Sequence, residues 1–455
     1  MSLASKGLTA SADRRKIRSR SSRRTFEMFD PHCRNASTND SCNDAIGGRV
    51  RTQARTRRRT LAAAVLCALV ASGCTAGRDP EQLTFMDYHG EEPMRSAMDA
   101  QLARCGEEIG IRVRHYSVTG DQLVPKALRM ASSRSLPDVL MLDNPDVPEF
   151  ATTQALVPLN QVGASADGIA PNIAETGRYQ GELYGVAPTV NALALYYNRD
   201  ILERVGARPP QTWEELAATA RVLTTPQHRG IGFSAYASFE GAYQFLAFLW
   251  PGGADERALD SPQAAGALRL WVDLVRSGSA PQSVLSWEQG DVKNQFTAGN
   301  LAMMVNGSWQ AAELRKTPGL NWGVVPIPVP RLGDPPATAL GGEVMTIPKT
   351  EPWRERKAAD LVTCMNTDRA QIAVASAADR VPSRPEAAAQ LRPQAEDIEV
   401  FYDTVAVARA RTQHLGTRWP DTARAMWTAI QSAISGNATP EQALKTAQEQ
   451  ANPGS

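Results

Sequence analysis

The sequence has few of the residues, and none of the short motifs, on which most enzyme chemistry depends. Its five histidines match no metal-ligand spacing. There is no Gly-x-Ser-x-Gly turn, no phosphate-binding Gly-x-x-x-x-Gly-Lys loop, no Gly-x-Gly-x-x-Gly opening a helix and no His-Glu-x-x-His. Carboxylates are numerous, so counting does not exclude a glycosidase pair, but none stands in a context that singles it out. We therefore expect no catalysis, no cofactor and no metal.

The sequence also has no marked excess of basic over acidic residues or the reverse. The formal net charge of +1 gives no bulk electrostatic argument for a nucleic-acid partner. Arginine is crowded at the front of the chain, so the remainder is acidic. Residues 1–49 are polar, rich in Arg, Ser and Asn and without hydrophobic periodicity, which is typical of disorder. We interpret them as an extension upstream of the true start at Val50; a nucleic-acid-binding arm is the alternative.

The apolar run near the front is too short to span a membrane. It covers residues 61–70, whereas a permanent span takes about 20 residues. Basic residues precede it and small residues follow, which predicts a signal peptide over residues 50–73. Val70-Ala71-Ser72-Gly73-Cys74 resembles a bacterial lipobox, with alanine where leucine is commonest. That resemblance implies lipidation of Cys74 and a tether to the outer face of the cell membrane. Two arginines before the run loosely fit a twin-arginine signal, so the export route stays open.

Cysteine is scarce, and its positions follow this export hypothesis. Of six cysteines, three lie in the part that processing removes and Cys74 is the anchor. Cys105 and Cys364 remain in the mature chain. An exported compartment permits a disulfide between them. Both lie in segments predicted to be helical, so two separate buried thiols are the competing interpretation.

The mature part has the composition of an ordinary globular protein with one large or two medium domains. The full sequence is 42% apolar and 21% charged, which are ordinary values for a globular protein. Strands predicted at 83–86, 111–116 and 137–142 alternate with helices at 93–110 and 121–132, the pattern of a doubly wound parallel sheet. The loops after the first and third strands should share the edge where such sheets bind ligands. These loops carry Tyr88, His89, Asp143 and Asn144, although the last two are also common turn formers.

A second parallel-sheet unit is predicted from strands at 192–198, 231–234, 301–305 and 322–325. The strand at 301–305 leads into Asn306-Gly307-Ser308-Trp309. A tryptophan at the carboxyl end of a buried strand points into the ligand crevice, and its flat apolar ring suits a sugar; a core tryptophan is the plain alternative.

The end of the chain carries one more strand and a helical region. Gly341-Gly342, within a strand predicted at 340–348, allow the backbone to approach a ligand or a crossing strand closely. Helices are predicted at about 395–410, at 420–434 and from 439.

A series of loose motifs follows in a specific order. The pieces are Leu-Pro-Asp-Val-Leu-Met from Leu136, Gly-Glu-Leu-Tyr-Gly-Val-Ala-Pro from Gly181, Leu-Tyr-Tyr-Asn-Arg-Asp from Leu195, Pro-Gln-Thr-Trp-Glu-Glu-Leu from Pro210, Gly-Ser-Trp from Gly307, Trp-Gly-Val-Val-Pro-Ile-Pro from Trp322, Gly-Gly from Gly341, Val-Pro-Ser-Arg from Val381 and Thr-Pro-Glu-Gln-Ala-Leu from Thr439. In this order they resemble bacterial extracellular solute-binding proteins of ABC importers, of the sugar-binding kind that includes the maltose-binding protein. The resemblance covers most of residues 74–455.

The resemblance implies an α/β fold of the type II periplasmic-binding-protein kind. Two lobes would enclose a ligand cleft. The first lobe would comprise residues 80–188 and 342–388, and the second residues 191–339 and 390–455. A monomer would capture a carbohydrate and deliver it to the permease subunits of the importer.

The same resemblance implies a set of ligand-contacting residues. Trp309 lies at the position of a sugar-stacking tryptophan. Polar contacts are implied for Tyr88, His89, Asp143, Asn144, Asn191, Gly341, Gly342 and Glu343. Tyr243 or Trp250 would supply a second aromatic face, and Arg418 is a weaker candidate. A binder of a glycerol phosphodiester or polyamine, or a secreted glycoside-acting enzyme, is the alternative; clustered Arg or Lys in the cleft would favour phosphate.

Overall fold

The structure, a computed structural model, describes residues 79–452; the predicted extension, signal peptide and Cys74 lie outside that range. A first sheet has the strand order β2-β1-β3-β12-β6. Strands β1, β2 and β3 are parallel, as predicted, whereas β12 runs antiparallel to β3 and to β6. The strands are β1 (Gln82–Asp87), β2 (Arg112–Ser117), β3 (Val139–Asp143), β6 (Gly185–Val186) and β12 (Glu343–Thr346).

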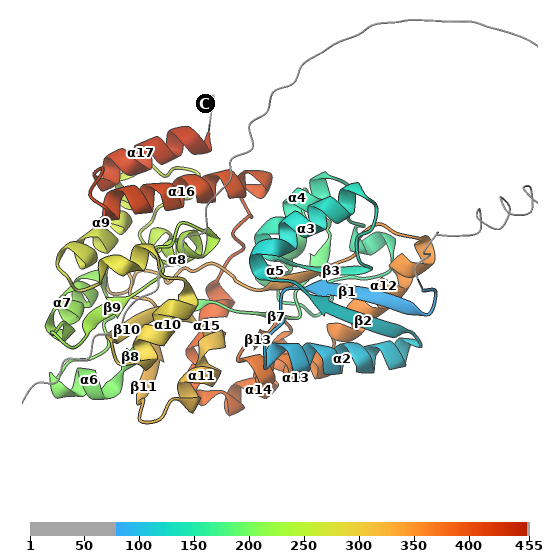
Figure 1. Cartoon of the computed structure of the whole chain (residues 1–455), viewed down its shortest axis with the longest axis horizontal. Helices are drawn as coiled ribbons and strands as arrows, with labels where there is room; N and C mark the ends of the chain where they lie inside the picture. The colour runs from blue at the N-terminus through green and yellow to red at the C-terminus, as the bar shows by residue number, and fades with distance from the viewer. Residues whose placement is uncertain (1–78, 453–455) are drawn as a thin grey trace, which may run out of the picture. The chain divides into compact units, whose positions relative to one another are not determined.

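Helices cover both faces of this sheet because consecutive residues of a strand point to opposite sides. Phe85 shares a core with Met98 of α2, whereas the next residue, Met86, shares another with Leu123 of α3. Figure 1 shows α2 and α3 on opposite sides of these strands. The helices of this first lobe are α2 (Met94–Ile109), α3 (Gly120–Ser132), α4 (Val147–Thr152), α5 (Pro171–Ala174), α12 (Pro352–Met365), α13 (Asp368–Ala378) and α14 (Pro385–Leu391).

A second sheet has the order β11-β8-β10-β9 and is mixed. Strands β9 and β10 are parallel, but β8 runs antiparallel to β10 and β11, so the prediction of a parallel unit is wrong here. The reason is that β8 carries the chain away from the first lobe, while β10 returns and ends with Gly307 beside Leu193. The strands are β8 (Leu193–Asn198), β9 (Arg229–Gly232), β10 (Leu301–Gly307) and β11 (Trp322–Val325).

A large apolar core with Trp271 fully buried fills the second lobe. Its helices are α6 (Arg199–Arg204), α7 (Trp213–Leu223), α8 (Phe239–Leu249), α9 (Pro262–Arg276), α10 (Gln289–Thr297), α11 (Ala311–Lys316), α15 (Val400–Val407), α16 (Trp419–Ile434) and α17 (Pro440–Ala451). The capping box predicted from Thr212 and Glu215 is present at the start of α7.

The helix predicted at about 395–410 is shorter than expected. It begins as α15 at Val400 and ends at Val407, after which the chain is extended. Arg409 N donates to Thr338 O and Leu340 N donates to Arg409 O, so backbone pairing with another segment replaces the helical hydrogen bonds. This extended stretch places Arg411 at the junction of the lobes.

Three segments connect the lobes side by side. Strand β7 (Thr189–Val190) pairs with β13 (Val381–Pro382), and Asn191 forms a bridge with Gly341. A separate hairpin of β4 (Arg178–Tyr179) and β5 (Glu182–Leu183) lies just before the first crossing. The predicted residue limits of the two lobes stay predictions.

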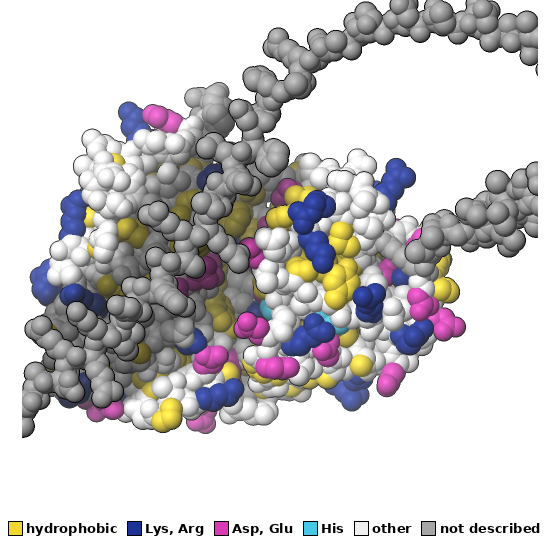
Figure 2. All heavy atoms as spheres, in the orientation of Figure 1, with side chains coloured by type: hydrophobic (Ala, Val, Ile, Leu, Met, Phe, Trp, Pro, Cys, Tyr) yellow, Lys and Arg dark blue, Asp and Glu magenta, His cyan; other side chains and the backbone are white. Residues whose placement is uncertain are grey.

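The surface shows no sorting of charge on the face visible in Figure 2, where basic and acidic side chains are interspersed. Large apolar side chains that are exposed lie far apart in the sequence, and one of them, Phe239, is 41% exposed in the region between the lobes. Among residues 79–452, no helix combines the length and the apolar character needed to cross a membrane.

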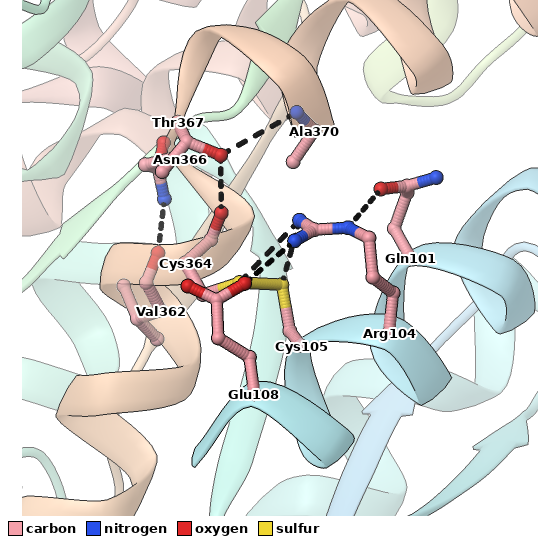
Figure 3. The surroundings of a disulfide bond; sticks show 9 residues. All are labelled: Gln101, Arg104, Cys105, Glu108, Val362, Cys364, Asn366, Thr367 and Ala370. Atoms are coloured by element: carbon pink, nitrogen blue, oxygen red, sulfur yellow. Dashed lines mark hydrogen bonds and ion pairs between the residues drawn. A yellow bond between two sulfur atoms is a disulfide. The ribbon is translucent and has the colours of Figure 1, made fainter.

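Cys105 of α2 and Cys364 of α12 form a disulfide, which settles the alternatives that the sequence left open. The bond joins positions 259 residues apart. Figure 3 shows Arg104 and Glu108 flanking the sulfur atoms, with Arg104 Nη2 3.1 Å from Cys105 Sγ. The bond fixes α12, which follows the crossing segment at Gly341 and strand β12, against α2.

Replacing both cysteines by serine should lower the free energy of unfolding by about 2–4 kcal/mol, because the unfolded chain is then no longer held in a long loop. Urea unfolding of the double variant and the wild type measures this difference. A reductant should destabilise the wild type and leave the variant unchanged; equal responses of the two proteins would contradict the bond.

Candidate functional site

A cavity of about 340 Å³ lies where the two lobes meet. Its wall is built by the carboxyl ends of β1 and β3 and the start of β12 on one side, and by α8, α10 and the segment after β10 on the other. The lining residues are Tyr88, His89, Asp143, Asn191, Phe239, Glu240, Tyr243, Gln289, Trp309, Gly341, Gly342, Glu343, Arg380 and Arg411. A second cavity of about 730 Å³ shares Tyr88, His89, Trp309 and Arg380 with it, so the two adjoin.

Glu343 is the most heavily bonded side chain of the lining. It is 4% exposed, and its carboxylate accepts hydrogen bonds from the Tyr88 hydroxyl and from Arg380 Nη1, the second at 2.7 Å. His89 Nε2 lies 3.3 Å from the oxygen that Arg380 contacts. Burial alone would raise the pKa of Glu343, but Arg380, His89 and Tyr88 hold that pKa well below its usual range. Glu343 therefore stays ionised, with partners from its own lobe.

Asp143 is paired with a residue of the opposite lobe. Arg411 Nη2 donates to Asp143 Oδ1 at 2.6 Å, and the same oxygen accepts from Asn144 N at 2.9 Å. Burial raises the pKa of Asp143, and Arg411 opposes that rise. Burial and the charge of Asp143 raise the pKa of the neighbouring Asp146 to about 8. The pair thus places one carboxyl group at the cavity, bonded to a cation from across the junction.

Gly341 lets the crossing segments approach closely. A Cβ added there would lie 2.0 Å from Asn191 Oδ1 and 2.7 Å from the Tyr243 hydroxyl oxygen. The Tyr243 hydroxyl donates to Asn191 Oδ1 at 3.4 Å, and Asn191 and Gly341 exchange backbone hydrogen bonds. The predicted close approach of Gly341 is therefore to a crossing strand, and any larger residue would push Asn191 and Tyr243 out of place.

Trp309 lies in a short 3-10 helix, Ser308–Gln310, directly after β10. Its ring folds back over Gly307, where an added Cβ would come within 1.8 Å of ring atom Cζ3. Asn306 is fully buried and holds the strand end below: its side chain accepts from Gly307 N at 3.0 Å and donates to Gln289 O at 2.9 Å. The partly buried ring packs against the apolar core of the second lobe and lines both cavities.

The sequence model of one protein family, bacterial extracellular solute-binding protein, matches residues 100–400, which is more than half of the chain. The chain belongs to this family. The predicted resemblance is thereby confirmed, and the family and its structural neighbours are binding proteins of ABC transporters.

Individual relatives of this solute-binding protein are distant. A Brucella abortus protein that is described as a binding protein is 25% identical over 287 residues, which are 59% of this chain and 67% of that one. The crystal structure of the cyclic α-maltosyl-1,6-maltose binding protein of Arthrobacter globiformis covers 82% of this chain and 99% of its own at 23% identity, with a TM-score of 0.72. UgpB of Mycobacterium tuberculosis, solved with glycerophosphocholine, is 19% identical over 82% of this chain and 98% of its own, with a TM-score of 0.71. At such identity these structures show the fold, a type II periplasmic binding protein of α/β composition, as predicted.

Nine of the residues predicted as ligand contacts come together at the cavity of about 340 Å³, called the inner cavity below. They are Tyr88, His89, Asp143, Asn191, Tyr243, Trp309, Gly341, Gly342 and Glu343. Their placement follows from the sheet edges and the crossing segments; what they bind stays a prediction.

Three predicted contacts lie outside the cavity lining. Asn144 is 1% exposed, and its side-chain nitrogen donates to the Leu340 and Gly342 carbonyls, so it holds the crossing segment instead. Trp250 is 5% exposed, donates to Glu256 and lies under the Arg409 guanidinium. The Arg418 side chain bonds Asn452.

Sequence reasoning missed Arg380, Arg411, Phe239, Glu240 and Gln289. Arg380 directly precedes the Val-Pro-Ser-Arg piece, and that position was the available signal. Arg411 gave none, because the predicted helix ran almost to it. Phe239 and Glu240 begin α8, and the amphipathic pattern of a helix does not show which end faces a cleft.

A buried acid–histidine network supports the loop that carries Tyr88 and His89. Asp87 is fully buried; its Oδ1 accepts from His89 N at 3.1 Å and its Oδ2 lies 3.0 Å from His115 Nε2. His115 Nδ1 lies 2.6 Å from Asp99 Oδ1. Burial alone would lower the pKa of His115, but Asp87 and Asp99 raise it above the ordinary 6.5. A protonated His115 thus neutralises Asp87 beneath the site.

His115 should make the stability of the protein depend on pH. Because its folded pKa is raised, its contribution is fully present below pH 6.5 and is lost as the pH rises through the folded pKa. Each pKa unit by which folding raises the pKa of His115 contributes at most about 1.4 kcal/mol to the free energy of unfolding. Urea unfolding of the wild type and His115→Gln across this window measures the difference between them, which should shrink with rising pH. A difference independent of pH would contradict the role of His115.

Proposed function

We propose that this solute-binding protein captures a neutral, hydroxyl-rich solute, a sugar or an oligosaccharide, and delivers it to the permease of an ABC importer. One observation carries the proposal: an aromatic platform and buried polar groups line the same cavity from opposite lobes. Trp309 offers an apolar face for a sugar ring, while Asp143 and Asn191 offer hydrogen-bond partners for its hydroxyls. This combination suits carbohydrates, whose ring faces are apolar and whose edges are polar.

The charges of the cavity support a neutral ligand. Each arginine of the lining is bonded to a carboxylate, Arg380 to Glu343 and Arg411 to Asp143. Clustered but unpaired arginines would favour a phosphate, and unpaired carboxylates a polyamine. Both arginines are thus paired, so an anionic solute finds no free cation to offset the loss of its hydration. The third carboxyl group of the lining, Glu240, accepts from Gln289 N at 3.0 Å, and burial raises its pKa, which disfavours its charged form.

The proposed action is capture and release, not catalysis. A solute held by Trp309 and Asn191 on one side and by Asp143 on the other would bind the closed protein more tightly than the open one. Only this difference in affinity can shift the population towards closure. The closed protein would then dock on the membrane permease as a monomer. The name of the Arthrobacter relative, a maltosyl-maltose binding protein, supports a carbohydrate as the solute.

A glycerol phosphodiester is the second candidate. Arg380 lines both cavities and contacts Glu343 through one of its three nitrogens. The structural neighbour solved with glycerophosphocholine has a TM-score close to that of the maltosyl-maltose binder. A binding screen should therefore include glycerophosphocholine beside the sugars.

Replacing Trp309 by alanine should weaken binding of a sugar about 10-fold or more, because the ring loses its apolar platform. The measurement is a thermal-shift screen of the Thr75–Ser455 protein against mono- and oligosaccharides, followed by titration calorimetry of each hit; a solute that binds the native state alone raises the melting temperature.

The matched control is Trp353→Ala, which removes a tryptophan that is 37% exposed and absent from the lining of both cavities. It should bind the same sugar as the wild type does. A Trp309→Ala variant that binds the sugar as tightly as the wild type would contradict the stacking role of Trp309. A screen in which no sugar but only a charged solute raises the melting temperature would overturn the carbohydrate proposal.

Cys74→Ala should release the protein from membranes, because the proposed lipid on that thiol would be lost. Fractionation of bacterial cells that express the full chain measures this: the wild type should sediment with the membranes and the variant should be soluble outside the cytoplasm. Cys364→Ser serves as the control, since it removes a cysteine without touching the anchor. Equal membrane association of all three proteins would contradict a lipid anchor.

A further inference from the structure

The geometry points to Arg411 as the residue that selects ligands by charge. We propose that Arg411 neutralises Asp143 across the junction of the lobes, so that the cavity accepts a neutral sugar and discriminates against its amino and acidic analogues. This inference rests on the proposed function and goes beyond it, because it names a residue that determines specificity by its charge.

First, the side chains of Asp143 and Arg411 differ in how much of their surface remains accessible. The Asp143 side chain keeps 31% of its surface accessible, whereas Arg411 keeps 4%. Arg411 Nη2 and Asn144 N both donate to Asp143 Oδ1, and within residues 79–452 the other oxygen, Oδ2, accepts no hydrogen bond. A solute in the cavity can therefore reach Asp143 Oδ2 more easily than Arg411, which also lines the cavity but is almost fully buried.

The second step is that both partners are fixed by their own lobes. Asp143 ends β3, and its carboxylate caps the following turn through Asn144 N. The Arg411 guanidinium lies over the Tyr243 ring of α8, 4.9 Å from its centroid. Arg411 begins the turn that follows Arg409, whose backbone is bonded to Thr338 and Leu340. Neither group can turn away without breaking these contacts.

The third step is the local charge. Besides Arg411, the acidic groups Glu343 and Asp146 act on Asp143, and Glu343 is already bonded to Arg380. Arg411 is thus the one cation of the described residues that bonds Asp143. Without it, an accessible carboxylate would face the cavity unbalanced and would favour an ammonium group on the ligand. Without the carboxylate, the buried guanidinium would favour an anionic group.

The test compares neutral, cationic and anionic forms of one sugar. Titration calorimetry at neutral pH would use glucose, glucosamine and glucuronate, and the matching galactose series. Arg411→Met should raise the affinity for the amino sugar relative to the neutral sugar by about ten-fold, and Asp143→Asn should do the same for the uronate. The double variant, which lacks both charges, should return to the neutral preference of the wild type.

Two further variants separate charge from structure. Arg411→Lys keeps the positive charge and should keep the neutral preference even where its affinity is lower. Arg418→Met, which removes an arginine outside the cavity lining, should behave as the wild type does. A purely structural role for Arg411 would instead weaken all three forms of the sugar equally.

The outcomes separate this inference from the proposed function. A wild type that binds a neutral sugar, with variants that lose affinity for all three forms alike, overturns the role of Arg411 alone. A wild type that prefers the uronate also overturns it, since Arg411 would then meet the ligand directly. A wild type that binds neither series and no mono- or oligosaccharide of the thermal-shift screen overturns the carbohydrate proposal, and the inference falls with it.

Discussion

The structure depends on how two acidic side chains, Glu343 and Asp143, are paired with cations where the lobes meet. Burial of an unpaired carboxylate is costly, so each needs a bonded cation. Glu343 is bonded to Arg380 of its own lobe. Asp143 finds Arg411 on the opposite lobe. The cation of Asp143 thus comes from the opposite lobe, whereas that of Glu343 does not.

Close backbone approach is the second constraint, and glycine makes it possible at two places. Gly307 leaves space for the Trp309 ring, and Gly341 leaves space for Asn191 and Tyr243. Both lie where a strand or crossing segment reaches the cavity. The aromatic platform and the polar groups thus hold their positions because the chain beneath them lacks a Cβ. Packing at these sites links the local sequence directly to the shape of the cleft.

The sequence was informative where a pattern is local. Alternating strands and helices predicted the parallel strands β1, β2 and β3, and loops at their ends predicted Tyr88, His89 and Asp143 at one edge. It failed where a position depends on distant pairing. The direction of β8 follows from the path of the chain between lobes, and Arg411 follows Arg409, whose backbone is bonded to the distant residues Thr338 and Leu340. Asn144 looked like its neighbour Asp143, yet its side chain points to the crossing segment, a difference that only the folded chain reveals.

Family membership explains the fold, and the cavity between the lobes explains why that fold would serve capture. The most direct measurement is a crystal structure of the protein with a sugar from the binding screen. The account predicts the sugar in the inner cavity, with one ring face against Trp309 and hydroxyls bonded to Asp143 and Asn191 from the two lobes. A sugar bound away from this cavity, or one that leaves Trp309 uncovered, would contradict it.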